Sequence, residues 1–353
     1  MNATTTSGHA NRVPVSIITG FLGSGKTTLL NHLTRQPGME SIALIINEFG
    51  EIGLDNLLVE TAIENTLLLE NGCICCSVRG DLVDTINDLF AKVRTGVMPA
   101  FSRIVIETTG LAEPGPIVNT LVNERVLASR CSLDQVITLI DGVQGRIQAD
   151  TYPEAMKQIA QADLGLITKR DLISEADAGA VAAFIGKINP SIRIGEIEHG
   201  QVSIDMLIGN TDKFSGISLL RVPNSNWGHL NDDNCQGHSH DHSHDFSREN
   251  QHSDFSTWSF AGRTALDRNR LFRWLEMLYS LRASCMLRMK GLVRVDGHAG
   301  PILLQAVGPV LSAPQTFPEW PGNEEKTRLV LIAKGLEPSD LGRSFDQYVL
   351  APA

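Results

Sequence analysis

Short apolar runs alternate with longer amphipathic stretches over the first 200 or so residues of the chain. The runs are rich in Val, Ile and Leu and predict buried strands, whereas the amphipathic stretches have the spacing of helices. This alternation is typical of an α/β domain with a mostly parallel sheet flanked by helices. The predicted strands are 15–19, 42–46, 103–107, 135–140 and 165–168, and the predicted helices are 26–35, 80–93, 116–128, 153–162 and 174–188.

The hydrophobic pattern breaks off after residue 223. Residues 224–254 are mostly Asn, Asp, Ser, Gln and His, so this stretch cannot bury a core and predicts a flexible linker. Strand patterns at 255–260, 287–295, 303–310 and 328–332 then accompany helix patterns at 266–281 and after Pro338. We therefore expect a disordered leader (1–12), an α/β domain (13–223), the linker (224–254) and a small α+β domain (255–353).

Composition narrows the class of protein. The net charge of −10 argues against nucleic acid or an anionic membrane as a partner. No apolar run approaches the roughly 20 residues that span a bilayer, and the N-terminus lacks the apolar stretch of a secretory signal. Three of the six cysteines crowd into four positions, which fits metal or redox use and not a disulfide framework. We expect a protein of the reducing cytoplasm.

A phosphate-binding motif follows the first predicted strand. Residues 20–28 read G-F-L-G-S-G-K-T-T and satisfy G-x-x-x-x-G-K-[ST], with an amphipathic helix directly after them. Glycines let the backbone N–H groups turn toward phosphates, and the helix N-terminus adds partial positive charge. Lys26 is expected to bridge the β- and γ-phosphates and Thr27 to reach Mg²⁺. The expected nucleotide contacts here are Gly20, Gly23, Ser24, Gly25, Lys26, Thr27 and Thr28.

A second acidic element should hold the magnesium ion. Glu107 ends a predicted buried strand, and Thr108-Thr109-Gly110 follow it. An acid at that place suits Mg²⁺, and the Gly110 N–H can contact the γ-phosphate, so the segment predicts a switch. We assign Lys26, Glu107 and Gly110 to catalysis.

The choice of base rests on residues 168–171, which read T-K-R-D after a predicted strand. They resemble the N-K-x-D signature that reads guanine. The Asp171 carboxylate can accept two hydrogen bonds from the guanine edge, which adenine cannot donate. Thr168, Lys169 and Asp171 therefore predict GTP as the nucleotide, with the Thr168 hydroxyl in place of the usual Asn.

Cysteines and histidines supply a second kind of chemistry. Cys73, Cys75 and Cys76 are too close for unstrained disulfides among themselves but can wrap one soft cation, zinc or cobalt. A fourth ligand must come from Glu48, a histidine, water or a client; a thiol cluster without metal is the alternative. The linker histidines alternate with Ser and Asp and predict a loose auxiliary metal collector or, alternatively, a solvated linker. They are His238, His240, His242 and His244.

The chain resembles the CobW family of P-loop GTPases over almost its whole length. The matching motifs are the phosphate loop, N-E-F-G at 47–50, C-I-C-C at 73–76, E-T-T-G-L-A-E-P at 107–114 and T-K-R-D at 168–171. The resemblance implies a GTPase whose switches touch a metal site on the C-x-C-C motif, and a small appended C-terminal domain. It places residues 47–50 in the first switch and Glu107 in the second. Glu113 stands where Asp is common in the family, and Thr168 where Asn is common.

These observations predict a GTP-hydrolysing metallochaperone that delivers zinc or cobalt to a client metalloprotein and forms a switch-dependent homodimer. Leu111 and Ala112 stand where some GTPases place a water-orienting Gln, which predicts slow intrinsic turnover. Two other classes stay open. A passive metal buffer would use nucleotide only for regulation, and a P-loop kinase for a small molecule would make the cysteines incidental.

Overall fold

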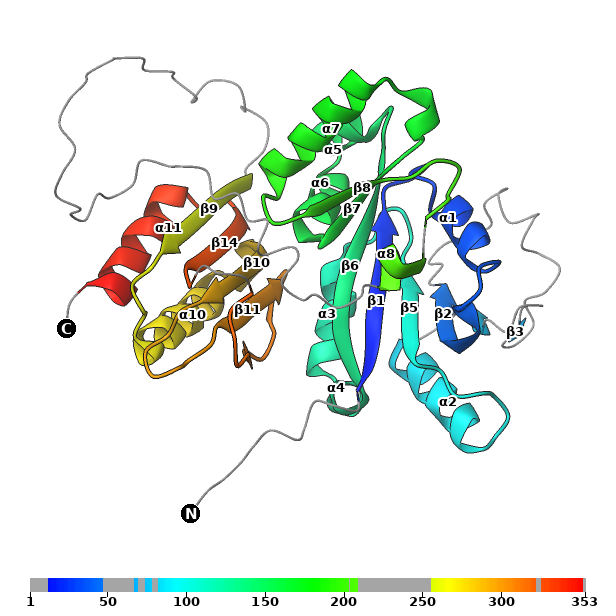
Figure 1. Ribbon diagram of the computed structural model, residues 1–353, viewed down its shortest axis with the longest axis horizontal. Helices are drawn as coiled ribbons and strands as arrows, with labels where there is room; N and C mark the ends of the chain where they lie inside the picture. The colour runs from blue at the N-terminus through cyan, green and yellow to red at the C-terminus, as the bar shows by residue number, and fades with distance from the viewer. Residues whose placement is uncertain are drawn as a thin grey trace.

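The computed structural model describes residues 12–46, 67–68, 74–77, 82–202, 204–208, 255–321 and 325–351. These residues form an α/β domain and a C-terminal domain that lie side by side (Figure 1). The predicted leader falls mostly outside the described residues, as does the predicted linker. No described helix is long and apolar enough to cross a membrane.

The α/β domain is built on a sheet with the strand order β3-β4-β2-β5-β1-β6-β7-β8. Every pair in it is parallel except β3 with β4. The strands are β1 (Val13–Gly20), β2 (Ile42–Ile46), β3 (Leu67–Leu68), β4 (Ile74–Ser77), β5 (Arg103–Glu107), β6 (Cys131–Asp141), β7 (Leu164–Thr168) and β8 (Arg193–Glu196). The predicted mostly parallel α/β fold is confirmed.

Helices cover both faces of this sheet, which explains why its strands read as continuous apolar runs. On β1, Ile17 packs toward α2, α3 and α4, and Ile18 packs toward α1 and α8 on the other face. The helices are α1 (Lys26–Leu33), α2 (Leu82–Arg94), α3 (Pro114–Asn123), α4 (Arg125–Arg130), α5 (Gly145–Thr151), α6 (Pro153–Gln161), α7 (Glu175–Ile188) and α8 (Ile204–Ile208).

The C-terminal domain is an antiparallel sheet with helices on one face, which confirms the predicted α+β class. Its strand order is β12-β11-β10-β14-β9, with β13 paired to β11. An aromatic cluster of Trp258, Trp274 and Phe345 fills the space between the sheet and α10 and α11. The elements are β9 (Phe255–Gly262), α10 (Arg268–Arg282), β10 (Met286–Val293), β11 (Ile302–Val307), β12 (Val310–Leu311), β13 (Gln315–Thr316), β14 (Thr327–Lys334) and α11 (Pro338–Phe345), followed by a π-helical turn, Asp346–Leu350.

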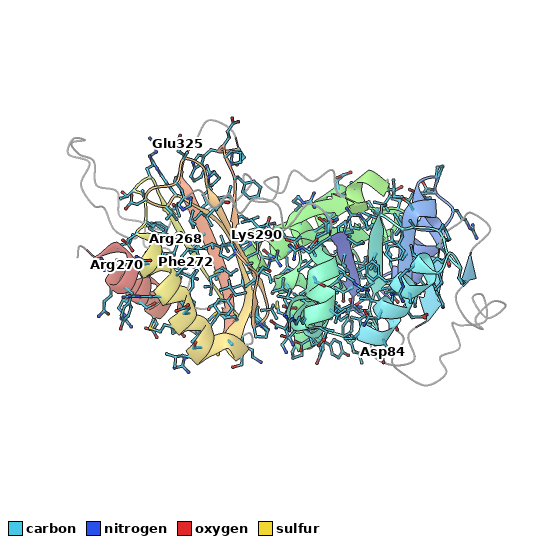
Figure 2. The ribbon with its side chains drawn as sticks, turned by 90° about the horizontal axis from the view of Figure 1, so that it is seen from below. Asp84, Arg268, Arg270, Phe272, Lys290 and Glu325 are labelled. Atoms are coloured by element: carbon cyan, nitrogen blue, oxygen red, sulfur yellow. The ribbon has the colours of Figure 1, made fainter. Side chains whose placement is uncertain are left out.

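The open face of the C-terminal sheet packs against the α/β domain. Ala160 of α6 lies in an apolar cluster with Leu287 and Leu303, and Val307 and Val310 pack with the residues of α3. A buried ionic cluster lies at the same boundary, where Figure 2 places Lys290 between the two domains. Helix α6 therefore contacts both the sheet of its own domain and the neighbouring domain.

Some predicted boundaries differ from the observed ones. The predicted helix 116–128 is two helices, because Glu124 adopts an extended conformation and starts α4 as its N-cap residue. Apolar residues continue at helical spacing on both sides of Glu124, so the pattern does not reveal the break. The predicted strand 303–310 turns back at Gly308, whose φ of 57° favours glycine. The elements not predicted are the strands β3, β4, β8 and β13 and the helices α5 and α8.

Candidate nucleotide and metal site

The phosphate loop has the backbone conformation that its glycines allow. Gly20, Gly23 and Gly25 have φ values of 150°, 74° and 92°. A side chain at Gly20 would place its Cβ 2.6 Å from the Leu139 carbonyl oxygen, so glycine is required there. Helix α1 begins at Lys26 with no side chain capping its first turn. Its first N–H groups are thus available to an anion, as a phosphate site requires.

Lys26 bends back over the loop that precedes it. Its ammonium donates to the carbonyl oxygens of Gly20 at 2.6 Å and Phe21 at 3.3 Å. Burial lowers the pKa of Lys26, and the charge of Glu107 opposes that shift. The Ser24 hydroxyl is also buried and has no hydrogen-bond partner within the described residues. An ammonium, an unpaired hydroxyl and an uncapped helix N-terminus together fit the phosphates of a nucleotide.

Glu107 lies at the same edge of the sheet as the phosphate loop. It ends β5, is 8% exposed and pairs in register with Ile18 of β1. The next residue is fixed to β1, because the Thr108 N–H donates to the Ile18 carbonyl at 2.9 Å and its hydroxyl donates to Thr19 at 2.8 Å. Glu107 and the exposed Thr27 are oxygen ligands of the kind that Mg²⁺ prefers. They are the residues that would hold this ion.

Gly110 packs directly on the phosphate loop. A Cβ there would lie 2.9 Å from the Leu22 backbone nitrogen and 2.6 Å from its side chain. On the other side, Gln158 of α6 donates to the carbonyl oxygens of Gly110 at 3.1 Å and Ala112 at 3.0 Å. Gln158 was not predicted as a site residue, since nothing in the sequence distinguishes it from other polar residues of an amphipathic helix.

Thr168 ties the T-K-R-D segment, residues 168–171, to the phosphate loop. Its buried hydroxyl lies 2.9 Å from the Ser24 carbonyl oxygen and 3.3 Å from that of Ile140. Lys169 has a left-handed φ of 55°, and its ammonium pairs with Asp141 at 2.7 Å. Asp171 is exposed in the 3₁₀ turn Arg170–Leu172 that follows β7. Asp141 was not predicted from the sequence, because its contact with the Lys169 ammonium joins residues that are 28 positions apart.

The structure describes only part of the predicted metal site. Cys75 and Cys76 lie on β4, opposite Leu44 and Ile45 of β2. Cys73, Glu48 and the linker histidines His238, His240, His242 and His244 lie outside the described residues. Among the residues that the structure does describe, no group of three or more His, Cys, Asp or Glu side chains could hold a metal ion. The C-x-C-C site therefore stays a prediction.

Comparison with known families assigns both domains. The model of the CobW/HypB/UreG nucleotide-binding domain matches residues 14–196. The chain belongs to the CobW/HypB/UreG family. The model of the cobalamin synthesis protein cobW C-terminal domain matches residues 255–349. The family resemblance found in the sequence motifs is thereby confirmed.

Relatives of this family match nearly the whole chain. The zinc chaperone YjiA of Escherichia coli is 32% identical over 329 residues, which are 93% of this chain and 95% of YjiA. Zinc-regulated GTPase metalloprotein activator 1 of Schizosaccharomyces pombe is 30% identical over 285 residues, 78% of this chain and 68% of the relative. The crystal structure of Zn(II)-bound YjiA GTPase from E. coli has a TM-score of 0.72 at 30% identity, covering 96% of this chain and 99% of YjiA.

Proposed function

We propose that the chain is a GTP-hydrolysing metallochaperone, which binds zinc at Cys73, Cys75 and Cys76 and delivers it to a client metalloprotein. The relatives named as zinc chaperones and zinc-regulated GTPases support zinc over cobalt. The observation that carries the proposal is the strand order β4-β2-β5-β1, which places the cysteine strand and the phosphate loop in one sheet.

The parallel register brings the cysteine strand β4 and the Glu107 strand β5 close to each other, with only β2 between them among the described strands. Ile45 of β2 pairs with Cys76 on one side and with Ile106 on the other. Cys76 is thus aligned with the residue that precedes Glu107. All three strands run in the same direction, so their carboxyl ends meet at one edge of the sheet. Zinc held near β4 and magnesium held near β5 would share that edge.

The nucleotide half of the mechanism follows from the described side chains. Lys26 exchanges the carbonyls of Gly20 and Phe21 for phosphate oxygens, and the loop N–H groups hold the remaining phosphate charge. Bound Mg²⁺ would neutralise charge that develops on the phosphates. Glu107 and Thr27 orient that ion, Gly110 lies where its N–H can meet the γ-phosphate, and Asp171 accepts hydrogen bonds from guanine.

Metal loading and hydrolysis are coupled in this proposal. A γ-phosphate that orders the segment after Glu107 would change the end of the sheet near Cys76, and so alter zinc affinity. Linkage requires that zinc change nucleotide affinity by the same factor. Turnover is slow without zinc or the client, because Leu111 and Ala112 supply no side chain that could orient water.

The test is a chelator competition for Zn²⁺ and Co²⁺ with Mg²⁺ and either GDP or a non-hydrolysable GTP analogue. We expect about one metal per chain, with an affinity that depends on the nucleotide and is lost in the C73S/C75S/C76S variant. Cys285→Ser, which removes a thiol far along the chain, serves as the matched control and should bind like the wild type. Equal zinc affinity in both nucleotide states would contradict the coupling. Several metals bound per chain whatever the nucleotide would indicate a passive buffer, and phosphorylation of a small molecule would indicate a kinase.

A switch-dependent homodimer in the cytoplasm completes the proposal. Leu22 and Leu111 are each 54% exposed and lie beside the phosphate loop and Gly110, and Tyr152, 46% exposed, stacks on Phe21. An apolar surface next to the nucleotide supports a contact that depends on it. Light scattering of the full chain should give a larger mass with the GTP analogue than with GDP; one mass in both states would contradict the dimer.

A further inference from the structure

A buried carboxylate joins the loops that follow two neighbouring strands, β6 and β7. Asp141 ends β6 and is 2% exposed. Its Oδ1 accepts the N–H groups of Val143 at 2.9 Å and Gln144 at 3.1 Å, which closes the turn after β6. Its Oδ2 lies 2.7 Å from the ammonium of Lys169, the residue that follows β7. The two oxygens of one side chain therefore hold the ends of both strands.

The backbones of these two loops are also in direct contact. Asp141 and Thr168 lie opposite each other in the parallel ladder of β6 and β7. The Gly142 N–H donates to the Thr168 carbonyl at 3.0 Å, and a Cβ at Gly142 would lie 2.7 Å from that oxygen. The loops pack too closely to admit a side chain between them, so the position of one loop sets the position of the other.

Lys169 has a backbone conformation that is unfavourable for its residue type. It is one of two described non-glycine residues with a positive φ, the other being His199. Its carbonyl accepts the Leu172 N–H at 3.0 Å and so starts the 3₁₀ turn that carries Asp171. Such a conformation persists only where the surrounding structure holds it, and it is concentrated at ligand sites. Among the described residues, Asp141 supplies the ion pair that holds the Lys169 side chain.

We propose that Asp141 is a positioning residue that sets the preference of the nucleotide site for guanine. Its carboxylate holds the Lys169 ammonium and so keeps Lys169 in the left-handed conformation. The turn that starts at Lys169 then presents the Asp171 carboxylate to the base. Asp141 acts through Lys169 and does not itself touch the base. This inference rests on the proposed function, because it takes Asp171 as the residue that accepts hydrogen bonds from guanine.

Two aspartates of β6 give a matched pair of variants. Asp141→Asn keeps an oxygen that can accept from the turn after β6 but directs an NH₂ group at the Lys169 ammonium, so it removes the ion pair and retains the turn. Asp134→Asn is the control, because Asp134 is largely buried and pairs with Arg103, which begins β5 at the edge of the sheet away from the phosphate loop. Thermal unfolding of each variant reports general damage to the sheet.

The measurement is the affinity of the full chain with Mg²⁺ for GDP and for inosine diphosphate, which lacks only the amino group of guanine. Loss of the ion pair predicts a fall of about 5- to 30-fold in the GDP affinity of Asp141→Asn, and a fall of at least about threefold in its preference for GDP over inosine diphosphate. Asp134→Asn should keep the wild-type preference, whatever its thermal stability. General damage would weaken both nucleotides equally, so an unchanged preference in Asp141→Asn overturns the role of Asp141.

Lys169→Met tests the route through Lys169 and stands even if Asp141→Asn fails to fold, since the Lys169 side chain is 38% exposed. We expect the same fall in preference as in Asp141→Asn, and no further fall in the double variant, because both changes break one ion pair. The wild-type preference in Lys169→Met, or losses that add in the double variant, overturns the inference.

Asp171→Asn separates this inference from the proposed function. If Asp171→Asn binds GDP like the wild type, the proposed base recognition falls together with the role of Asp141. If Asp171→Asn loses GDP affinity while Asp141→Asn and Lys169→Met keep the wild-type preference, the proposed function stands and only the role of Asp141 is overturned.

Discussion

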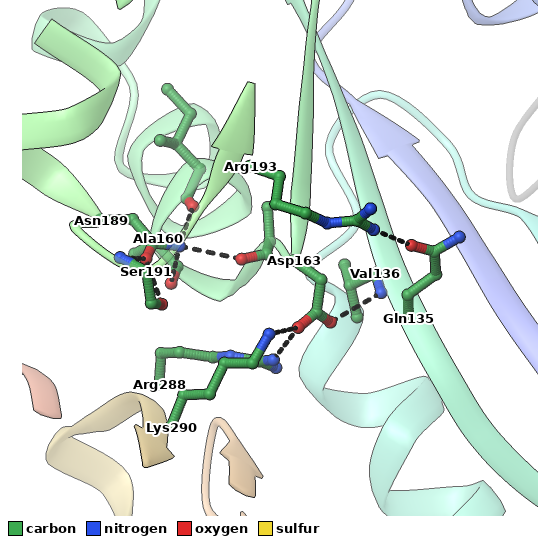
Figure 3. Close-up of polar contacts among 11 residues, drawn as sticks. Gln135, Val136, Ala160, Asp163, Asn189, Ser191, Arg193, Arg288 and Lys290 are labelled. Carbon is green, nitrogen blue, oxygen red and sulfur yellow. Dashed lines mark hydrogen bonds and ion pairs between the residues drawn. The ribbon is translucent and has the colours of Figure 1, made fainter. Parts of the chain in front are cut away.

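The Asp163 carboxylate of the α/β domain lies 3.1 Å from the Lys290 ammonium of the C-terminal domain, and both side chains are less than a tenth exposed. Arg288 donates to the same oxygen, and the Val136 N–H donates to the other at 3.0 Å (Figure 3). Burial disfavours the charge of Asp163, but Arg288, Lys290 and the Val136 N–H outweigh it and lower the pKa of this carboxyl. Two buried cations of one domain thus depend on a single carboxylate of the other.

Replacing this carboxylate should destabilise the chain strongly. Asp163→Asn leaves Arg288 and Lys290 buried without their counter-charge, which costs about 3–5 kcal/mol of unfolding free energy. The matched control is Asp340→Asn, whose partner Arg343 is 77% exposed; that change should cost no more than about 1 kcal/mol. Urea unfolding at pH 7 measures both. A loss of similar size in the two variants would contradict the dependence on burial.

The cost of Asp163→Asn should also depend on pH. Because the pKa of Asp163 is lowered in the folded chain, its charge stabilises the fold above the pKa of an unfolded aspartate, about 3.9. That contribution disappears as the pH falls through the folded pKa, which lies below this value. The difference in unfolding free energy between wild type and variant should stay constant from pH 7 to about 5 and shrink below about 4. A difference in unfolding free energy that grew as the pH fell would contradict this prediction.

Lys26→Ala should lose nucleotide binding and keep its fold. The Lys26 ammonium donates to two carbonyls of its own loop, and its charge also acts on the buried Glu107, so the fold of the variant is checked by thermal unfolding. Loss of two charge-assisted contacts to phosphates predicts a fall in GTP and GDP affinity of about 10²- to 10⁴-fold. Isothermal titration measures it, with Lys187→Ala in the last turn of α7 as a cation control. Unchanged nucleotide affinity would show that residues 20–28 do not form the phosphate site.

Asp171→Asn tests the choice of base. In the proposed function the Asp171 carboxylate accepts two hydrogen bonds from guanine, and an amide in its place would lose at least one and offer a donor instead. We expect GTP affinity to fall by about tenfold or more, and affinity for the xanthine nucleotide, which carries an acceptor where guanine has its amino group, to rise. Competition with a fluorescent nucleotide measures both. Equal GTP affinity in the variant and the wild type would assign base recognition to other residues.

Cys131 should resist alkylation in the folded chain. Burial raises the pKa of this thiol to about 11, against the opposing charges of Arg130 and Arg12. At pH 8 only about one thiol in a thousand is then ionised, and the thiolate is the reactive form. Peptide-resolved labelling with iodoacetamide should modify the partly exposed Cys285 before Cys131. Labelling in urea, where both react, is the control; rapid labelling of Cys131 in the native chain would contradict its burial.

Local signals predicted the elements that bear the nucleotide site. The apolar run 103–107 and the motif at 20–28 gave β5, the phosphate loop and α1, because strand, turn and helix are each specified by adjacent residues. Contacts between residues far apart in the sequence could not be predicted. Gln158 meets Gly110 across 48 residues and Asp163 meets Arg288 across 125, and no periodicity records such pairs. The motif T-K-R-D indicated guanine but not that the Thr168 hydroxyl would bind the phosphate loop.

Strand β2 is the only described strand between the cysteine strand β4 and the Glu107 strand β5. It is hydrogen-bonded in register to both, so neither neighbour can slide along it by one residue without turning every side chain to the opposite face of the sheet. The motion that these three hydrogen-bonded strands permit is a change in their twist. In the proposed coupling of nucleotide to metal, a signal that crosses the sheet would therefore pass through β2 as a change of twist, and a change in zinc coordination should appear as a rotation of the ligands and not as a change in their spacing along the chain.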